Sequence, residues 1–156
     1  MAGAGASPIV VIPLGNRSMG DDGVGPAVLD LLAADEGTAF AVREPRDAMG
    51  MVACWEGAST TIVIDAAQSG AEPGTIHRIE HADGVVPKDA GRMSSHGMGL
   101  AEALALSEAL GRTPPRLVVY AVEAASFEPE APLTPAVAAS VPTVAAQIRA
   151  EIEGAR

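Results

Sequence analysis

The sequence predicts an α/β fold, a three-layer sandwich in which a mostly parallel, twisted sheet of about five strands carries helices on both faces. Segments typical of strands alternate along the chain with segments typical of helices, as in βαβ units. Several strand segments are continuous apolar runs, which indicates strands buried on both faces. A length of 156 residues, 48% of them hydrophobic and 19% charged, suits one globular domain spanning residues 1–156.

The first half of the chain is expected to supply three strands and two helices. Residues 8–14 (PIVVIPL) are apolar and rich in β-branched side chains, which favours a strand, and a glycine-bearing turn follows them. Apolar residues then recur at helical spacing over residues 24–32. Residues 40–44 and 60–64 are expected to be the next two strands, with a short helix over 49–56 between them.

The strand predicted over residues 75–81 (TIHRIEH) differs from the others. Apolar and polar side chains alternate along it, which is typical of an edge strand with one solvated face. We therefore expect His77 and His81 to be exposed to solvent. A long surface loop is expected to follow over residues 82–95.

The C-terminal third is expected to form a helix, a strand and a second helix. An Ala/Leu-rich helix is predicted over 97–110, and residues 116–122 (RLVVYAV) are a further buried strand. The last helix is expected to begin at Thr134 and Pro135, a capping residue followed by a proline in the first position. Pro142 is expected to break or kink this helix.

Composition and charge exclude several classes of protein. Twenty acidic against ten basic residues give a net charge of -10, and aromatic residues make up 3% of the chain, so no nucleic-acid partner is expected. Cys54 is the only cysteine, which excludes an intramolecular disulfide and favours the cytoplasm. The apolar run near the N-terminus is too short for a signal peptide or a membrane span. We expect a monomer that binds no membrane.

Three polar residues stand where predicted buried strands give way to loops or where a helix begins. Asp22 follows the first strand, Asp65 ends the strand 60–64, and His96 precedes an Ala/Leu-rich helix. The carboxyl ends of strands in an open α/β sheet form the crevice where ligands bind, so these residues can meet there. Two carboxylates and one imidazole suit zinc, nickel, manganese or iron and leave coordination positions open.

Each of these residues also has a purely structural explanation. Asp22 can cap the helix that starts near Gly23 and can also serve as a ligand. Asp65 can accept hydrogen bonds from loop N–H groups, and His96 can be a hydrogen-bonding residue at the entry of a helix. The sequence alone leaves these alternatives open.

The sequence disfavours two other kinds of site, a phosphate-binding loop and a cysteine nucleophile. Glycines in the loop 15–25 can cradle a phosphate, but the spacing fits neither GxGxxG nor the P-loop, and Asp21 and Asp22 repel an anion. Cys54 can act as a nucleophile with His96, but its apolar helical setting indicates a buried, inert thiol. Neither a Ser/His/Asp signature nor an HExxH motif is present, so no protein nucleophile is assigned.

Four segments in order along the chain resemble the hydrogenase maturation endopeptidases, the nickel-dependent proteases that trim the C-terminus of the large subunit of nickel-iron hydrogenases. The segments are LGNRSMGDDGVGPAV (14–28), IVIDA (62–66), SSHGMGLAEALAL (94–106) and VEAASFEPEAPLTPAV (122–137). Pro13 departs from this pattern, because relatives usually carry a glycine there.

The resemblance implies a metal site and a substrate. The metal-contacting residues of the family fall on Asp22, Asp65 and His96, and a further family aspartate falls near Asp47, which implies a possible catalytic contribution from Asp47. The metal is expected to be nickel already installed in the [NiFe]-hydrogenase large-subunit precursor, with other divalent metals able to substitute in vitro. Cleavage is expected after a basic residue and to release a short tail.

Two alternatives to the protease remain open from the sequence. A non-proteolytic metal-dependent chaperone or regulatory binding protein of the same fold would keep the crevice and dock a partner without cutting it. A peptidyl-tRNA hydrolase also carries an LGN after a strand, but it needs a basic surface, which a net charge of -10 contradicts.

Overall fold

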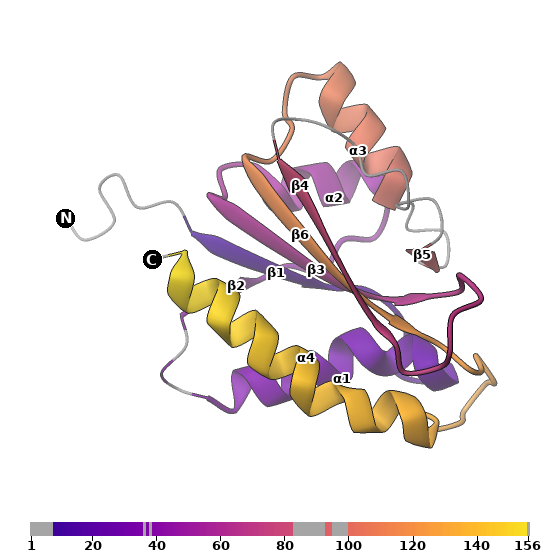
Figure 1. Cartoon of the computed structure of the whole chain (residues 1–156). Coiled ribbons are helices and arrows are strands. Elements are labelled where there is room, and N and C mark those ends of the chain that lie inside the picture. Colours follow the sequence, from indigo (N-terminus) through magenta and orange to yellow (C-terminus); the bar gives the residue numbers. More distant parts are fainter. Residues whose placement is uncertain (1–7, 36, 38, 83–92, 95–99, 156) are drawn as a thin grey trace.

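The sheet and its helices follow one another much as the sequence predicts. The computed structural model describes residues 8–35, 37, 39–82, 93–94 and 100–155. In chain order, and as drawn in Figure 1, the elements are β1 (Ile9–Pro13), the 3-10 helix η1 (Gly20–Gly23), α1 (Val24–Ala33), β2 (Ala41–Val42), α2 (Ala48–Trp55), β3 (Thr60–Ala67), β4 (Ile76–Ala82), β5 (Met93–Ser94), α3 (Leu100–Ala109), β6 (Arg116–Glu123) and α4 (Pro135–Gly154).

The strands form one mixed, mostly parallel sheet in the order β2-β1-β3-β6-β4. β2, β1, β3 and β6 are parallel, and β4 runs antiparallel to β6. β4 is an edge strand, as the alternation of its side chains predicts. The two-residue strand β5 pairs with β3 beyond the end of β1. The sequence does not predict β5, which lies inside the expected loop 82–95 and is too short to leave a pattern.

Helices cover both faces of the sheet, which confirms the three-layer prediction (Figure 1). α1 and α4 pack on one face, where Val11, Ile62 and Val118 contribute to the apolar core. α2 and α3 pack on the other face, where the alternate residues of the same strands, such as Ile12 and Val63, form a second core cluster. The continuous apolar runs of β1, β3 and β6 therefore serve both cores at once.

β3 is longer than the sequence predicts. The expectation that this strand ends at Asp65 is wrong, because β3 continues to Ala67 and pairs with β6 along that length, with Asp65 opposite Ala121 and Ala67 opposite Glu123. The ladder hydrogen bonds of β6 hold these last residues in the sheet although one of them is acidic. Asp65 is consequently a strand residue, and its side chain projects on the same side as Val63, toward α2 and α3.

α4 runs from Pro135 to Gly154 as one helix, so of the predicted break or kink at Pro142 the break does not occur. Pro142 lies inside the helix and removes one N–H donor. The buried stripe of the helix packs against the sheet on both sides of the proline, and tertiary packing of this kind outweighs local propensity. The members of that stripe are Val137, Val141, Val144, Ile148 and Ile152.

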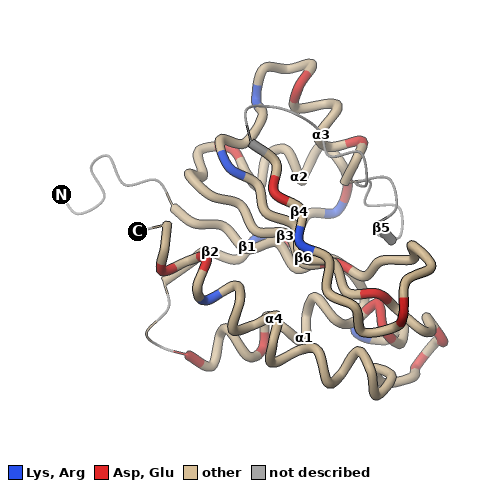
Figure 2. Tube along the Cα trace, in the orientation of Figure 1, with Lys and Arg blue, Asp and Glu red and all other residues tan. Residues whose placement is uncertain are grey.

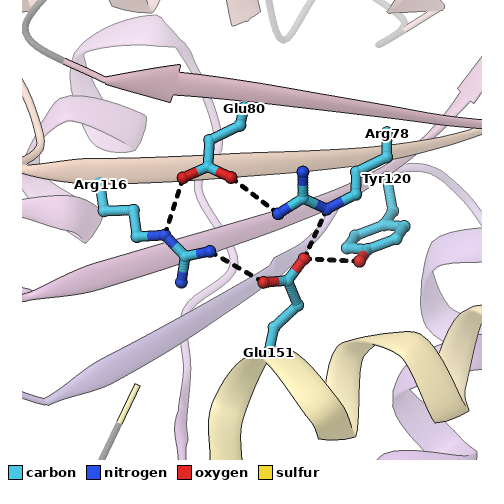
Figure 3. Close-up of polar contacts among 5 residues, drawn as sticks. All are labelled: Arg78, Glu80, Arg116, Tyr120 and Glu151. Atoms are coloured by element: carbon cyan, nitrogen blue, oxygen red, sulfur yellow. Dashed lines mark hydrogen bonds and ion pairs between the residues drawn. The ribbon is translucent and has the colours of Figure 1, made fainter. Parts of the chain in front are cut away.

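A ring of ion pairs joins the C-terminal half of α4 to the edge of the sheet (Figure 3). Glu151 of α4 accepts hydrogen bonds from Arg78 of β4, Arg116 of β6 and the hydroxyl of Tyr120 at 2.6, 2.9 and 2.7 Å. Glu80 closes the ring by accepting from Arg78 and Arg116 at 2.8 and 3.0 Å. These contacts lower the pKa of Glu151 to about 2, although burial acts in the opposite direction. The ring braces the edge strand against α4.

Charge is distributed unevenly over the fold (Figure 2). Acidic residues gather on the loops at the carboxyl ends of β1, β3 and β6, where the chain carries Asp21, Asp22, Glu72, Glu128 and Glu130. Glu72, Glu128 and Glu130 form no ion pair within the described part of the chain. No helix among the described residues is long and apolar enough to cross a membrane.

Candidate functional site

Asp65 is the centre of the candidate site. It lies in β3 and is completely buried, and its Oδ1 accepts a hydrogen bond of 2.8 Å from the N–H of Ala66. Its Oδ2 has no hydrogen-bond partner within the described part of the chain. Burial raises the pKa of Asp65 well above its ordinary value, and the negative charge of Asp22 raises it further. A buried carboxylate oxygen without a partner is costly, and a metal ion or a proton would offset that cost.

Asp22 lies in η1, on the loop that leaves β1. Its carboxylate is buried, and Oδ2 accepts a hydrogen bond of 2.7 Å from the N–H of Asn16. The residue that caps α1 is Gly23, without a side-chain hydrogen bond, so the predicted role of Asp22 as the cap of that helix does not describe this turn. The hydrogen bond between Asn16 and Asp22 holds the loop that precedes η1.

Glycine at position 15 makes this turn possible. Gly15 has φ of +107°, a conformation that side-chain-bearing residues rarely adopt. A Cβ atom at this position would lie 2.0 Å from the carbonyl oxygen of Asp22 and 3.1 Å from its Oδ1. The LGN sequence therefore lets the backbone fold closely around Asp22.

The fold brings Asp22 and Asp65 together at the carboxyl edge of the sheet. β1 and β3 are neighbours, and the N–H of Leu14 donates to the carbonyl of Ile64 at 2.8 Å, so the loop that carries Asp22 starts beside Asp65. Because the two carboxylates are close, the charge of Asp22 raises the pKa of Asp65. The two carboxylates lie near each other, and their role as metal ligands stays a prediction.

His96 lies outside the described residues, and its predicted place in the site stays a prediction. The described part of the chain contains no group of three or more histidine, cysteine, aspartate or glutamate residues that could hold a metal ion. β5 comes shortly before His96, and its Ser94 pairs with Ala66, the residue after Asp65.

Asp47 and Cys54 both belong to α2. Asp47 is exposed and is the N-cap of the helix, where its Oδ1 accepts a hydrogen bond of 2.7 Å from the N–H of Gly50. This contact gives Asp47 a structural role, and its catalytic contribution stays a prediction. Cys54 is half-buried, and burial raises the pKa of its thiol, which agrees with an inert side chain.

Two further buried carboxylates, Asp21 and Glu123, flank the site and were not singled out from the sequence. Glu123, at the end of β6, accepts hydrogen bonds from the N–H and hydroxyl of Ser69 at 2.8 and 2.6 Å and from the N–H of Gly70 at 3.2 Å. His77 approaches its Oε1 at 3.0 Å. These contacts lower the pKa of Glu123 although burial opposes them.

The expectation that His77 and His81 are exposed to solvent is wrong. His81 is 1% exposed, and His77 is half-buried against Glu123. Strand alternation puts both on the same face as Ile79, which packs in the core under α2 and α3. The solvated positions of this edge strand are instead Arg78 and Glu80, on the α4 side.

Comparisons with known proteins agree with the fold and the sequence motifs. Residues 46–151 match the HycI family, hydrogenase maturation protease. The fold is similar to the hydrogenase maturating endopeptidase HybD from E. coli, with a TM-score of 0.76 and 22% identity over 94% of this chain and 93% of that one. It is also similar to the [NiFe] hydrogenase maturation protease HybD from Thermococcus kodakarensis, with a TM-score of 0.70 and 22% identity over 93% and 99%.

A third solved structure is slightly nearer in sequence. The hydrogenase 2 maturation peptidase from Thaumarchaeota archaeon SCGC_AB-539-E09 is 26% identical over 90% of this chain and 95% of that one, with a TM-score of 0.66. A comparison with curated protein sequences found no significant match.

Proposed function

This chain belongs to the hydrogenase maturation protease family, and from that premise we propose that it is the endopeptidase that removes the C-terminal extension of a [NiFe]-hydrogenase large-subunit precursor. The proposed substrate carries nickel, and the proposed site is the pair Asp22 and Asp65 together with His96.

The observation that carries the proposal is that Oδ2 of Asp65 has no hydrogen-bond partner among the described residues. A fully buried carboxylate with one oxygen that has no partner among the described residues, beside a second buried carboxylate, costs the folded protein free energy. A divalent metal ion bound there would neutralise both carboxylates and offset this cost. Carboxylate oxygens with an imidazole nitrogen are a donor set that nickel and other divalent metals accept.

The role of His96 rests on its place in the sequence. It follows Ser94 by two residues, and Ser94 pairs with the neighbour of Asp65. Two residues of chain span at most about 7 Å between Cα atoms. Three ligands of this kind are too few to fill the coordination shell of nickel, which supports a metal that arrives with ligands of its own from the precursor.

The chemistry proposed for the site is metal-assisted hydrolysis. Nickel bound in the precursor would polarise the scissile carbonyl and activate a water molecule, which are the ordinary contributions of a Lewis acid. Asp22 and Asp65 would hold that metal at the carboxyl edge of the sheet and so fix the scissile peptide there. Asp65 would release its proton on binding the metal, because only the ionised carboxylate is a good ligand.

Cleavage of a nickel-loaded precursor by purified variants tests the proposal. We expect Asp22→Asn and His96→Ala to abolish release of the C-terminal peptide while the circular dichroism spectrum and melting temperature stay close to those of the wild type. Asp30→Asn, which removes an exposed carboxylate paired with Arg17, is the matched control and should cut normally. Normal cleavage by both site variants would contradict the proposal.

The same experiment distinguishes the proposed protease from a binding protein of the same fold. A chaperone or regulatory protein would form a stable complex with the precursor and leave its C-terminus intact. Mass spectrometry of the precursor after incubation separates the two functions, because only a protease shortens it.

A further inference from the structure

The segment between β6 and α4, residues 124–134, is fastened onto the turn that carries Asp22. The N–H of Asp21 donates to the carbonyl of Ser126 at 2.9 Å, and the N–H of Gly20 donates to the carbonyl of Ala131 at 3.2 Å. Gly20 has φ of +57°, and a Cβ atom there would lie 2.8 Å from the carbonyl oxygen of Ser126. Only glycine permits this close approach of the two backbones.

The carboxylate of Asp21 ties both ends of this segment together. It is completely buried and accepts hydrogen bonds from the N–H groups of Ala125, Ser126 and Thr134 at 2.8, 3.1 and 2.7 Å. The hydroxyl of Thr134 donates to its Oδ2 at 2.8 Å. Thr134 is the N-cap residue of α4, and its hydroxyl serves Asp21 and makes no cap hydrogen bond to the helix. One side chain thus closes a loop of about ten residues.

Asp21 and Asp22 are adjacent in the chain, but their carboxylates contact different parts of the structure. The oxygens of Asp21 are occupied by four donors of the 124–134 segment, so Asp21 is not available as a metal ligand. The carboxylate of Asp22 accepts from Asn16 on the other side of the turn and acts electrostatically on Asp65. Because the two residues share one turn of η1, the anchoring of Asp21 restricts the backbone that orients Asp22.

We propose that Asp21 is a positioning residue: by fastening the 124–134 segment to η1 it holds the Asp22 carboxylate beside Asp65 and so sets the affinity of the site for the metal carried by the substrate. This inference rests on the function proposed above. Groups that orient metal ligands change metal affinity or activity by about 10–100-fold when they are removed. Charge-assisted hydrogen bonds from backbone N–H groups are the strong kind that can impose such an orientation.

The test uses Asp21→Asn, Thr134→Val and a control, Ile148→Val, in the core between α4 and the sheet. Asp21→Asn replaces a carboxylate that accepts from all sides with an amide that carries two donors. Thr134→Val removes only the hydroxyl contact and should have a smaller effect in the same direction. Ile148→Val lowers thermal stability without touching η1 or the 124–134 segment.

Two readouts distinguish positioning from a general loss of structure. The amide proton of Asn16 reports on the Asp22 carboxylate through their 2.7 Å hydrogen bond, so Asp21→Asn should shift its NMR signal upfield and speed its exchange. For the nickel-loaded precursor, KM should rise about 10–100-fold with a much smaller change in kcat. Ile148→Val should change neither readout, although its melting temperature falls.

An Asn16 signal and a KM that stay at their wild-type values in Asp21→Asn would overturn the inference. Equal changes in Asp21→Asn and Ile148→Val would also overturn it, because they would show an effect of stability alone. If the wild-type protein does not cleave the precursor, the proposed function fails. The Asn16 signal then still decides whether Asp21 orients Asp22.

Discussion

Two regions of the molecule use carboxylates in opposite ways. In the ring that joins α4 to the edge strand, Glu151 receives donors from Arg78, Arg116 and Tyr120, and its pKa falls to about 2. At the carboxyl edge of the sheet, Asp65 has one oxygen without a partner in the described part of the chain, and its pKa rises. The ring stabilises the fold, whereas Asp65 is held in a state that a bound cation would relieve. The hydrogen bonds that each carboxylate accepts therefore distinguish Glu151, which braces the fold, from Asp65, which we propose binds the metal.

The largest effect is expected from Asp65→Asn. Loss of this ligand should reduce cleavage of the nickel-loaded precursor by more than about 100-fold, beyond the range for groups that only orient ligands. The same substitution should raise the melting temperature, because it removes a carboxyl group whose ionised form is destabilised by burial. Cleavage assays and calorimetry on one preparation measure both. A variant that loses both activity and stability would contradict the contrast with Glu151.

Substitution of Glu151 should lower the stability of the protein and leave cleavage of the precursor unchanged. Glu151→Gln leaves two arginines without their shared carboxylate, and we expect a loss of about 1.5–3 kcal/mol in the free energy of unfolding. Cleavage at saturating precursor should stay normal, because the ring lies on the α4 face of the sheet, whereas the Asp65 side chain projects from the opposite face. Urea unfolding and the cleavage assay test this pair of outcomes. Glu102→Gln, on α3, removes an acid that belongs to neither region and serves as the control.

The pH dependence of stability should also distinguish the two regions. The pKa of Glu151 is lowered in the folded protein, so its contribution is complete above its unfolded value of 4.5 and is lost as pH falls toward about 2. The pKa of Asp65 is raised, so its proton favours the folded state, and this contribution is lost as pH rises from 3.8 through the folded pKa. The free energy of unfolding, measured with urea at a series of pH values, tests both statements. In Glu151→Gln it should fall less as the pH drops below 4.5, and in Asp65→Asn it should fall less as the pH rises above 3.8. Unchanged profiles would contradict these assignments.

The smallest effect concerns Asp47, which lies outside both regions. Asp47→Ala should cost about 1 kcal/mol of stability through the lost N-cap of α2, whereas Asp47→Asn keeps a capping residue and should cost much less. Neither change should alter kcat/KM if the side chain serves only the helix. A large drop in kcat/KM for Asp47→Asn, at unchanged stability, would show a catalytic contribution.

The fold was predictable because its signals are local. Continuous apolar runs mark β1, β3 and β6, and the alternation over residues 75–81 marks the edge strand β4. The strand β5 and the extension of β3 to Ala67 depend on pairing with distant residues, which no local pattern encodes. The burial of His81 likewise depends on the core packed over that face of the edge strand.

The candidate site was predictable in part. Asp22 lies in the turn that follows β1 and Asp65 lies near the carboxyl end of β3, and parallel strands bring such residues to one edge. Asp21 and Glu123 could not be separated from other acids by sequence, because their roles arise from backbone donors more than 50 residues away in the chain. Long-range hydrogen bonds of this kind exist only in the folded chain.

Cleavage of the large-subunit precursor with and without nickel tests the central claim most directly. The wild-type protein should release the C-terminal peptide from the nickel-loaded precursor and leave the nickel-free precursor intact, and Asp65→Asn should cut neither. Equal cleavage of both precursors by the wild-type protein would contradict a site that acts through the metal in its substrate.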